Sequence, residues 1–215
     1  MLKVAVISDI HAELQPLQEV LEDISNHDIS QIWCLGDFAS GGPDALLCFE
    51  AVLSSCGLIL GGNHELFVAA EIWGDVQADY ALWAKEAHSQ LGQERVALLK
   101  TLSSRIDSEH IQMVHGSMRD PLMEWISSEE VAADQWELMA APLLLFGHTH
   151  RPAWWHKTQS GGAESKSCSN EWGSLEGVNM LNPGAVCTPR KWRWMELELD
   201  DDGRASRVRW HSQSK

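Results

Sequence analysis

Two observations predict an α/β fold for this chain of 215 residues. Through the first 150 residues, short apolar runs typical of strands alternate with longer segments whose apolar residues recur at helical spacing, as in βαβ units. After residue 150 the helical segments stop, and further short runs typical of strands follow. We therefore expect a sheet fed by crossover helices first and hairpin-connected strands afterwards.

The elements of the first part can be placed in order. Five apolar runs predict strands at residues 2–7, 31–35, 58–60, 110–114 and 142–146. Helical spacing predicts helices over residues 14–24, 45–55, 76–91 and 93–103. Ser127 and Glu130 have the spacing of a capping box, which predicts a last helix from there to about Met139.

The second part is expected to contain only strands and loops. Strands are predicted at residues 153–156, 178–181, 192–199 and 205–211, with a hairpin turn at Asp200–Gly203 between the last two. Residues 158–175 are rich in Gly and Ser, which favours a mobile loop. Trp192 and Trp194 should share one strand face, whereas Trp154 and Trp155 should point in opposite directions. Core packing explains these tryptophans best, with a stacking surface for an aromatic group as the alternative.

Composition restricts the classes of partner. The formal net charge is −15 and no block of Lys and Arg is present, which disfavours long nucleic acids more than small phosphate esters. No apolar run approaches the length that spans a membrane, and the N-terminus leads directly into the first predicted strand. The five cysteines form no CxxC pair, so we expect reduced thiols and a cytoplasmic protein.

Each of the five apolar runs of the first part ends in a cluster of Asp, Asn or His side chains. The clusters are Ser8–His11, Gly36–Asp37, Gly61–Glu65, His115–Gly116 and Gly147–His150. A single His after a strand is usually structural, but five such clusters in a row are difficult to explain that way. Because loops at the carboxyl ends of strands converge on one crevice, the clusters predict one composite site. Their residue types suit two divalent metal ions.

The order Asp-x-His, Gly-Asp, Gly-Asn-His-Glu, His-Gly and Gly-His-x-His resembles the calcineurin-like metallophosphoesterases. Other segments resemble the small bacterial predicted phosphodiesterases of that superfamily, namely Gly36–Pro43, His115–Ser117, Arg119–Pro121, Gly147–Pro152 and Asn182–Gly184. The resemblance implies a single domain over residues 1–215. It also implies that the α/β fold consists of two mixed β-sheets packed as a sandwich with flanking helices, in four layers.

The resemblance further implies two divalent metal ions, from among Mn, Fe, Zn and Ni. One ion would be held by Asp9, His11, Asp37 and His150. The other would be held by Asp37, Asn63, His115 and His148, so that the two oxygens of Asp37 bridge the pair. A hydroxide shared by two such ions can attack phosphorus in line. His64 would serve the leaving group as a general acid or as a cation, and its orienting partner is open, with Glu65 adjacent in sequence.

Some positions depart from the family patterns. The protein Ser/Thr phosphatases carry Gly-Asp-x-x-Asp-Arg-Gly, whereas Phe38–Gly41 follow Asp37 here and offer neither that carboxylate nor that Arg. Ala185 stands where the small phosphodiesterases usually have Ser, and Lys191 stands where they usually have Asp. Arg151 and Arg190 are candidate phosphate contacts, with surface ion pairs as the alternative.

The sequence thus predicts a metal-dependent phosphoesterase that hydrolyses small phosphodiesters. A phosphomonoesterase and a dinucleoside polyphosphate hydrolase are the alternatives within the enzymes. A scaffold subunit of the same fold is disfavoured, because every ligand position and His64 carry suitable residue types. The oligomeric state is open.

Overall fold

The computed structural model describes residues 1–71, 74, 77–187 and 191–213. In these residues one mixed sheet has six strands in the order β3-β2-β1-β11-β12-β9. Strands β1, β2 and β3 run parallel, and the others are antiparallel to their neighbours. The strands span Leu2–Ile7 (β1), Gln31–Cys34 (β2), Leu58–Ile59 (β3), Gly173–Ser174 (β9), Arg193–Leu199 (β11) and Ala205–Ser212 (β12).

The second mixed sheet of the described residues also has six strands, in the order β4-β5-β6-β10-β7-β8. Its parallel pairs are β5 with β6 and β6 with β10. The strands span Arg105–Asp107 (β4), Ile111–Val114 (β5), Leu143–Leu145 (β6), Ala153–Lys157 (β7), Ala163–Ser165 (β8) and Asn179–Asn182 (β10). The prediction of two mixed sheets is therefore confirmed.

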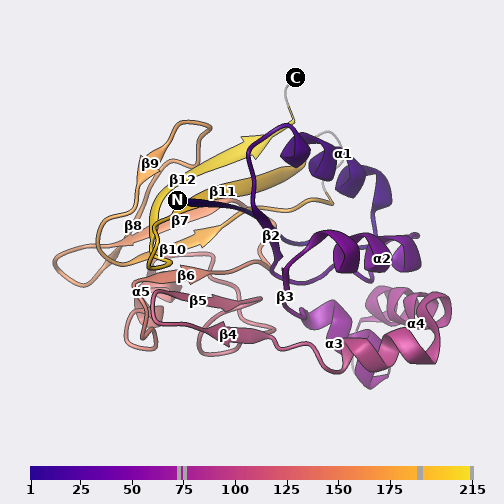
Figure 1. The fold of residues 1–215 in the computed structure, drawn as a ribbon. Helices are drawn as coiled ribbons and strands as arrows, with labels where there is room; N and C mark the ends of the chain where they lie inside the picture. Colours follow the sequence, from indigo (N-terminus) through magenta and orange to yellow (C-terminus); the bar gives the residue numbers. More distant parts are fainter. Residues whose placement is uncertain (72–73, 75–76, 188–190, 214–215) are drawn as a thin grey trace.

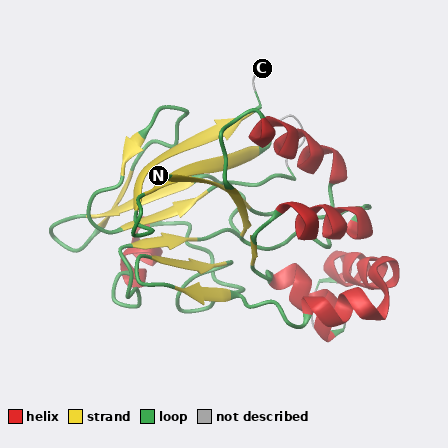
Figure 2. Ribbon diagram, viewed as in Figure 1, coloured by secondary structure: helices red, strands yellow, loops and turns green. Residues whose placement is uncertain are grey.

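The helices cover the outer faces of the two sheets. Helices α1 to α4 gather beside the first sheet, and α5 lies at the other end of the molecule beside the second sheet (Figures 1 and 2). They span Leu14–Ser25 (α1), Ala45–Ser55 (α2), Asn63–Ala70 (α3), Ala78–Leu99 (α4) and Glu129–Gln135 (α5). In the part of the chain described here, no helix is long and apolar enough to cross a membrane.

The alternation of side chains along the strands builds the layers. Ala5 and Ile7 of β1 pack in the cluster formed with the helices, whereas Val4 and Val6 pack between the sheets. On β6, Leu143 and Leu145 also lie between the sheets, and Leu144 faces the cluster that includes residues of α5. Because successive strand residues point to opposite faces, each sheet contributes to two apolar layers. The predicted four-layer arrangement follows from this.

The tryptophan predictions for the strands are confirmed as core packing. Trp192 and Trp194 belong to the same cluster, and their indole N–H groups donate to Glu19 and Asp23 of α1 at 2.9 and 2.7 Å. Trp154 lies between the sheets, while Trp155 faces the opposite cluster.

Some predicted boundaries were wrong. The segment 158–175, expected to be a loop, contains the short strands β8 and β9. The last helix begins after Ser128, whose side chain accepts from Val131 N, and not after Ser127. It ends at Gln135 instead of about residue 139. The predicted break at residue 92 is present as a kink in α4, where Gly92 has a φ of 70° that favours glycine.

Candidate metal centre

The five clusters of the sequence meet at one edge of the sandwich. They follow the parallel strands β1, β2 and β3 of one sheet and β5 and β6 of the other. Backbone hydrogen bonds join the loops within each sheet: Asp9 N donates to Gly36 O at 3.1 Å, and Gly147 N donates to His115 O at 2.8 Å. His148 N donates to Asp9 Oδ1 at 3.2 Å and thereby links the two sheets. The predicted convergence of the clusters is confirmed.

One group of candidate ligands comprises Asp9, His11 and His150. The Nε2 atoms of His11 and His150 lie 2.9 Å apart, and His150 Nε2 lies 3.6 Å from Asp9 Oδ1. Asp9 is fully buried, and its Oδ2 atom has no hydrogen-bond partner. A buried carboxylate oxygen without a partner is costly, and a bound cation would satisfy it. The donor set of this group therefore fits a divalent metal.

A second group surrounds His115. Its Nε2 atom lies 3.1 Å from Asn63 Oδ1, 3.3 Å from His148 Nδ1 and 3.2 Å from Asp37 Oδ2. Both His115 and Asp37 are buried. Four ligand atoms of N and O type thus point at one another, as they do around a divalent ion.

Asp37 is common to both groups. Its Oδ2 atom lies 3.2 Å from His115 Nε2 and 3.8 Å from His11 Nε2. Its Oδ1 atom accepts a hydrogen bond from His64 N at 2.9 Å. The sequence argument used both oxygens for bridging, but here Oδ2 is the oxygen that faces both groups and Oδ1 holds the backbone of His64.

Hydrogen bonds to carbonyl oxygens determine which ring nitrogen of His115 and of His148 is available to bind a cation. His115 Nδ1 lies 2.9 Å from Leu35 O, and His148 Nε2 lies 3.2 Å from Met123 O. A carbonyl oxygen only accepts, so these nitrogens carry the protons in the neutral rings. The lone pairs of His115 Nε2 and His148 Nδ1 then face the group, which is the arrangement that metal-binding histidines use.

The protonation states fit cation binding. Burial lowers the pKa of His11 and of His148 to about 4, so both rings are neutral near pH 7. Burial alone would lower the pKa of His115, but the buried Asp37 carboxylate raises it to about 9. Burial would likewise raise the pKa of Asp37, but His115 and His64 hold it well below its usual range. The proton on His115 serves as the counter-charge of Asp37, and a divalent cation can take its place.

Backbone strain is concentrated in the ligand loops. Of the seven non-glycine residues with positive φ in the described chain, six are in these loops: Asp9, His11, Ala12, Asp37, His148 and His150. Left-handed backbone is unfavourable for residues with a Cβ and persists where the surroundings enforce it, which is common at functional sites. The loops are therefore held in shapes that the chain would not adopt on its own.

Glu65 organises two of these loops, a role that the sequence analysis missed. Its Oε2 accepts from the N–H groups of Asp37 and Gly62, both at 2.8 Å, and its Oε1 accepts from Phe38 at 2.9 Å and Ala39 at 2.8 Å. Burial and the nearby Asp37 raise the pKa of Glu65, against the effect of these N–H donors. A carboxylate at the third residue of a helix often caps N–H groups, and the position of Glu65 in α3 is the signal that could have indicated this.

His64 lies between the first group and an aromatic wall. Its ring centroid is 4.5 Å from that of His11 and 5.5 Å from that of Tyr80. Burial lowers the pKa of His64, against the opposing effect of Asp37. Glu65 is adjacent in sequence, but its two oxygens are used by backbone N–H groups. Glu65 is therefore not shown to orient His64.

A cleft of about 650 Å³ lies over both groups. Tyr80, Trp83 and Trp125 line it, and Trp125 is 58 % exposed with its ring 5.6 Å from that of His148. Sequence reasoning missed these three aromatic residues and also Cys187, which lies beside His11 and His150. No periodicity or motif marks them, because α4 and the segment after β5 reach the cleft only through the tertiary fold.

Of the two candidate phosphate contacts, Arg151 and Arg190, only Arg151 is described by the structure. Arg151 lines the cleft. Ion pairs of arginine within the described chain involve Arg95, Arg105, Arg119, Arg207 and Arg209. Arg151 is not among them, so the alternative of a surface ion pair is not supported for Arg151 within the described residues. Arg190 lies outside the described residues.

Comparison with known proteins identifies the family. The calcineurin-like phosphoesterase superfamily domain matches residues 2–197. The chain belongs to this superfamily. The matched span contains every candidate ligand, and this calcineurin-like phosphoesterase has the His and Asp groups for divalent metals that its family typically binds. Membership of the superfamily supports a hydrolase that acts on phosphoester bonds.

Individual relatives agree with the family and the fold. An uncharacterized protein of Methanocaldococcus jannaschii is 29% identical over 199 residues, which cover 87% of this chain and 77% of that protein. The crystal structure of a metallophosphoesterase from Sphaerobacter thermophilus is 28% identical with a TM-score of 0.82, over 99% of this chain and 89% of that one. A hypothetical protein of Pyrococcus horikoshii shares the fold at 16% identity and a TM-score of 0.77, over 99% of this chain and 88% of that one.

Proposed function

We propose that this calcineurin-like phosphoesterase hydrolyses small phosphodiesters with two divalent metal ions. The observation that carries the proposal is the pair of ligand groups that share Asp37. Asp9, His11, Asp37 and His150 would hold one ion, and Asp37, Asn63, His115 and His148 the other. When bound, the two ions would supply an activated water and Lewis-acid stabilisation of the charge on the phosphoryl oxygens.

The remaining chemistry is assigned to side chains of the cleft. His64 would donate a proton to the leaving oxygen or stabilise its charge, because its ring lies between the first group and the lining of the cleft. Arg151 would contact a non-bridging phosphoryl oxygen, because it lines the same cleft. The aromatic side chains of Tyr80, Trp83 and Trp125 would pack against an ester group of the substrate.

Two features of the charge distribution support a diester as the substrate: the residues after Asp37 and the net charge of the protein. A phosphodiester carries one negative charge and a phosphomonoester dianion carries two. The residues after Asp37 supply no cation: Phe38, Ala39 and Ser40 are buried, and Gly41 lines the cleft. The net charge of −15 further opposes multiply charged substrates.

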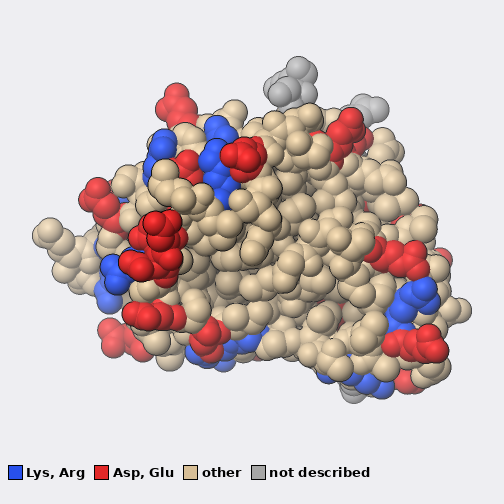
Figure 3. Space-filling view, viewed as in Figure 1, with Lys and Arg blue, Asp and Glu red and all other residues tan. Residues whose placement is uncertain are grey.

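Long nucleic acids are not expected as substrates. On the face shown in Figure 3, Lys and Arg are scattered among Asp and Glu, and no basic stripe is formed. Binding along a phosphate backbone requires clustered cations. The free thiols of Cys34, Cys48, Cys56 and Cys168 are consistent with a reducing compartment, and we infer a cytoplasmic protein from them.

A substrate panel with Mn²⁺, Zn²⁺, Fe²⁺ or Ni²⁺ tests the proposal. We expect the metal-loaded protein to hydrolyse bis-nitrophenyl phosphate and nitrophenyl methyl phosphate with a higher kcat/KM than nitrophenyl phosphate. A preference for the monoester would indicate a phosphomonoesterase. Selective cleavage of dinucleoside polyphosphates would indicate the second alternative. A protein with both metals bound and no turnover on any ester would support the scaffold function.

A further inference from the structure

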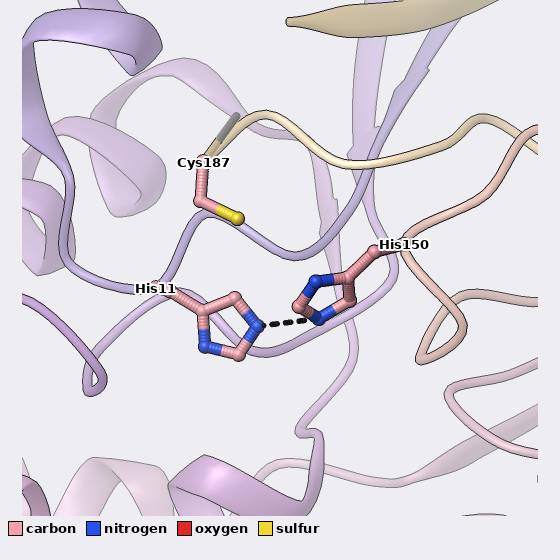
Figure 4. A group of neighbouring side chains, drawn as sticks. All are labelled: His11, His150 and Cys187. Atoms are coloured by element: carbon pink, nitrogen blue, oxygen red, sulfur yellow. Dashed lines mark hydrogen bonds between the residues drawn. The ribbon is translucent and has the colours of Figure 1, made fainter. Parts of the chain in front are cut away.

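A thiol lies beside the first group of candidate ligands. The His11 ring comes from the loop after β1, the His150 ring from the loop after β6, and Cys187 from the segment after β10. Figure 4 shows the sulfur of Cys187 turned toward the two imidazole rings. One ligand atom of each residue, the Sγ of Cys187 included, lies within 4.8 Å of the other two. The thiol is therefore close enough to share an ion with both histidines.

The backbone around Cys187 is fixed to a candidate ligand. Val186 N donates to Ser8 O at 3.1 Å, and Cys187 N donates to Asp9 O at 3.0 Å. These two bonds hold the segment along the end of β1, next to Asp9 itself. Asn182 supports the same region, because its side-chain amide donates to Gly147 O at 2.7 Å in the loop that carries His150. The position of the thiol is thus set by the loops that set the ligands.

A separate observation indicates a cation at this position. Asp9 is 0 % exposed, and its Oδ2 atom has no hydrogen-bond partner. The other carboxylate oxygen of Asp9, Oδ1, lies 3.6 Å from His150 Nε2, which itself lies 2.9 Å from His11 Nε2. A zinc-like ion binds donors of these types, namely a carboxylate oxygen, imidazole nitrogens and a thiolate sulfur.

We propose that the thiolate of Cys187 is an additional ligand of the metal at the first position, together with Asp9, His11, Asp37 and His150. The inference rests on the metal centre of the proposed function. On binding, the thiol loses its proton to solvent and a sulfur–metal bond forms. Two ligands on opposite sides of one ion are up to about 4.4 Å apart for Zn–S and Zn–N bonds, so the observed spacing requires only a small shift.

The additional ligand makes the two metal positions chemically different. The second group offers only N and O atoms, which suit Mn²⁺ as well as other ions. A thiolate is a soft ligand and favours Zn²⁺, Co²⁺ or Cd²⁺ over Mn²⁺ and Mg²⁺. The first position should therefore prefer a thiophilic ion even when Mn²⁺ is in excess.

Titration of the metal-free full chain with Co²⁺ tests the ligand. We expect a thiolate-to-cobalt charge-transfer band in the near ultraviolet. The band should disappear in Cys187→Ser and Cys187→Ala and persist in Cys56→Ser, since Cys56 is a half-buried thiol at the end of α2. Competition between Cd²⁺ and Mn²⁺ should show a loss of cadmium preference of about tenfold or more in the Cys187 variants.

The outcomes separate this inference from the proposed function. A wild-type protein that binds two Co²⁺ per chain without a thiolate band overturns the thiol ligand and leaves the metal centre intact. A wild-type protein that binds no metal overturns both. Alkylation of the wild-type protein, read by mass spectrometry, avoids the need for a variant to fold. Bound Zn²⁺ should protect Cys187 from alkylation, and equal labelling of Cys187 with and without Zn²⁺ contradicts the proposal.

Discussion

The carboxylate of Glu65 accepts a hydrogen bond from the backbone N–H of Asp37 at 2.8 Å. The same carboxylate accepts from Gly62, Phe38 and Ala39, so one side chain holds the loop after β2 against the start of α3. Gly62 comes so close to Asp37 Oδ1 that a Cβ at residue 62 would overlap it. Glu65 therefore positions Asp37, the residue shared by both ligand groups, and belongs to neither group itself.

The first prediction concerns the hydrogen bonds that the Glu65 carboxylate accepts. Glu65→Gln replaces one accepting oxygen with an NH₂ group that faces two N–H donors. We expect a loss of roughly 2–5 kcal/mol in the free energy of unfolding, measured by urea denaturation. The amount of metal bound per chain should also fall, because Asp37 loses its fixed position. Glu94→Gln, on the exposed face of α4, is the matched control and should change neither quantity. Unchanged stability in Glu65→Gln would show that the four hydrogen bonds contribute little.

The second prediction concerns the shared ligand. Asp37→Asn removes the charge that faces both groups, whereas Asn63→Ala removes a neutral oxygen from one group. We expect Asp37→Asn to lose more metal per chain than Asn63→Ala, measured by elemental analysis after dialysis. The exposed Asp28→Asn should retain the wild-type content. Asp37→Asn with full metal content and full rate would exclude a bridging role.

The convergence of the candidate ligands could be predicted from sequence because their clusters follow apolar strands, whereas their division into two groups was implied by the family resemblance. Strand ends converge for topological reasons, so residue order alone placed Asp9, Asp37 and His115 at one edge. Glu65 was missed for the opposite reason. Its position at the third residue of α3 indicates the cap on Gly62 N, but nothing in the local pattern indicates that its carboxylate also meets the N–H groups of residues 37–39.

The lining of the cleft was unpredictable for a similar reason. Tyr80 and Trp83 lie on α4, and Trp125 lies in the segment between β5 and α5. They approach the ligands only when these segments fold over the edge of the sandwich. The tryptophans at residues 154 and 194, on β7 and β11, and Trp192, just before β11, were predicted to pack in the core because strand alternation is a local property.

The third prediction concerns His64. If its ring protonates the leaving oxygen, His64→Ala should lower kcat by about 10²–10⁴-fold for esters of alkyl alcohols, which are poor leaving groups. Nitrophenolate needs little protonation, so nitrophenyl esters should lose much less. Both metals should stay bound, which elemental analysis can verify. Equal losses across the leaving-group series would assign His64 to charge stabilisation instead of proton donation.

The fourth prediction concerns the aromatic lining. Trp125→Leu removes the exposed indole that lies beside His148. We expect KM for bis-nitrophenyl phosphate to rise roughly 2- to 12-fold, the value of one aromatic contact. Nitrophenyl methyl phosphate, which has a methyl group in place of the second ring, should be affected less. If KM rises equally for both esters, the indole acts on the ligands and not on the substrate.

The last prediction concerns the cause of the diester preference, which is either the residues of the site or the net charge of the whole protein. Two contributions oppose a dianionic monoester: the absence of a cation after Asp37, and the net charge of −15. Salt screens charges that are more than about 8–10 Å apart at physiological ionic strength, whereas it screens a buried site much less. We therefore expect the ratio of kcat/KM for bis-nitrophenyl phosphate over nitrophenyl phosphate to stay above one as salt is raised. A ratio that falls toward one as salt is raised would assign the preference to the net charge of the whole protein. A monoester preference at every ionic strength would contradict the diesterase proposal, and it would indicate that Arg151 or another cation of the cleft binds the second charge.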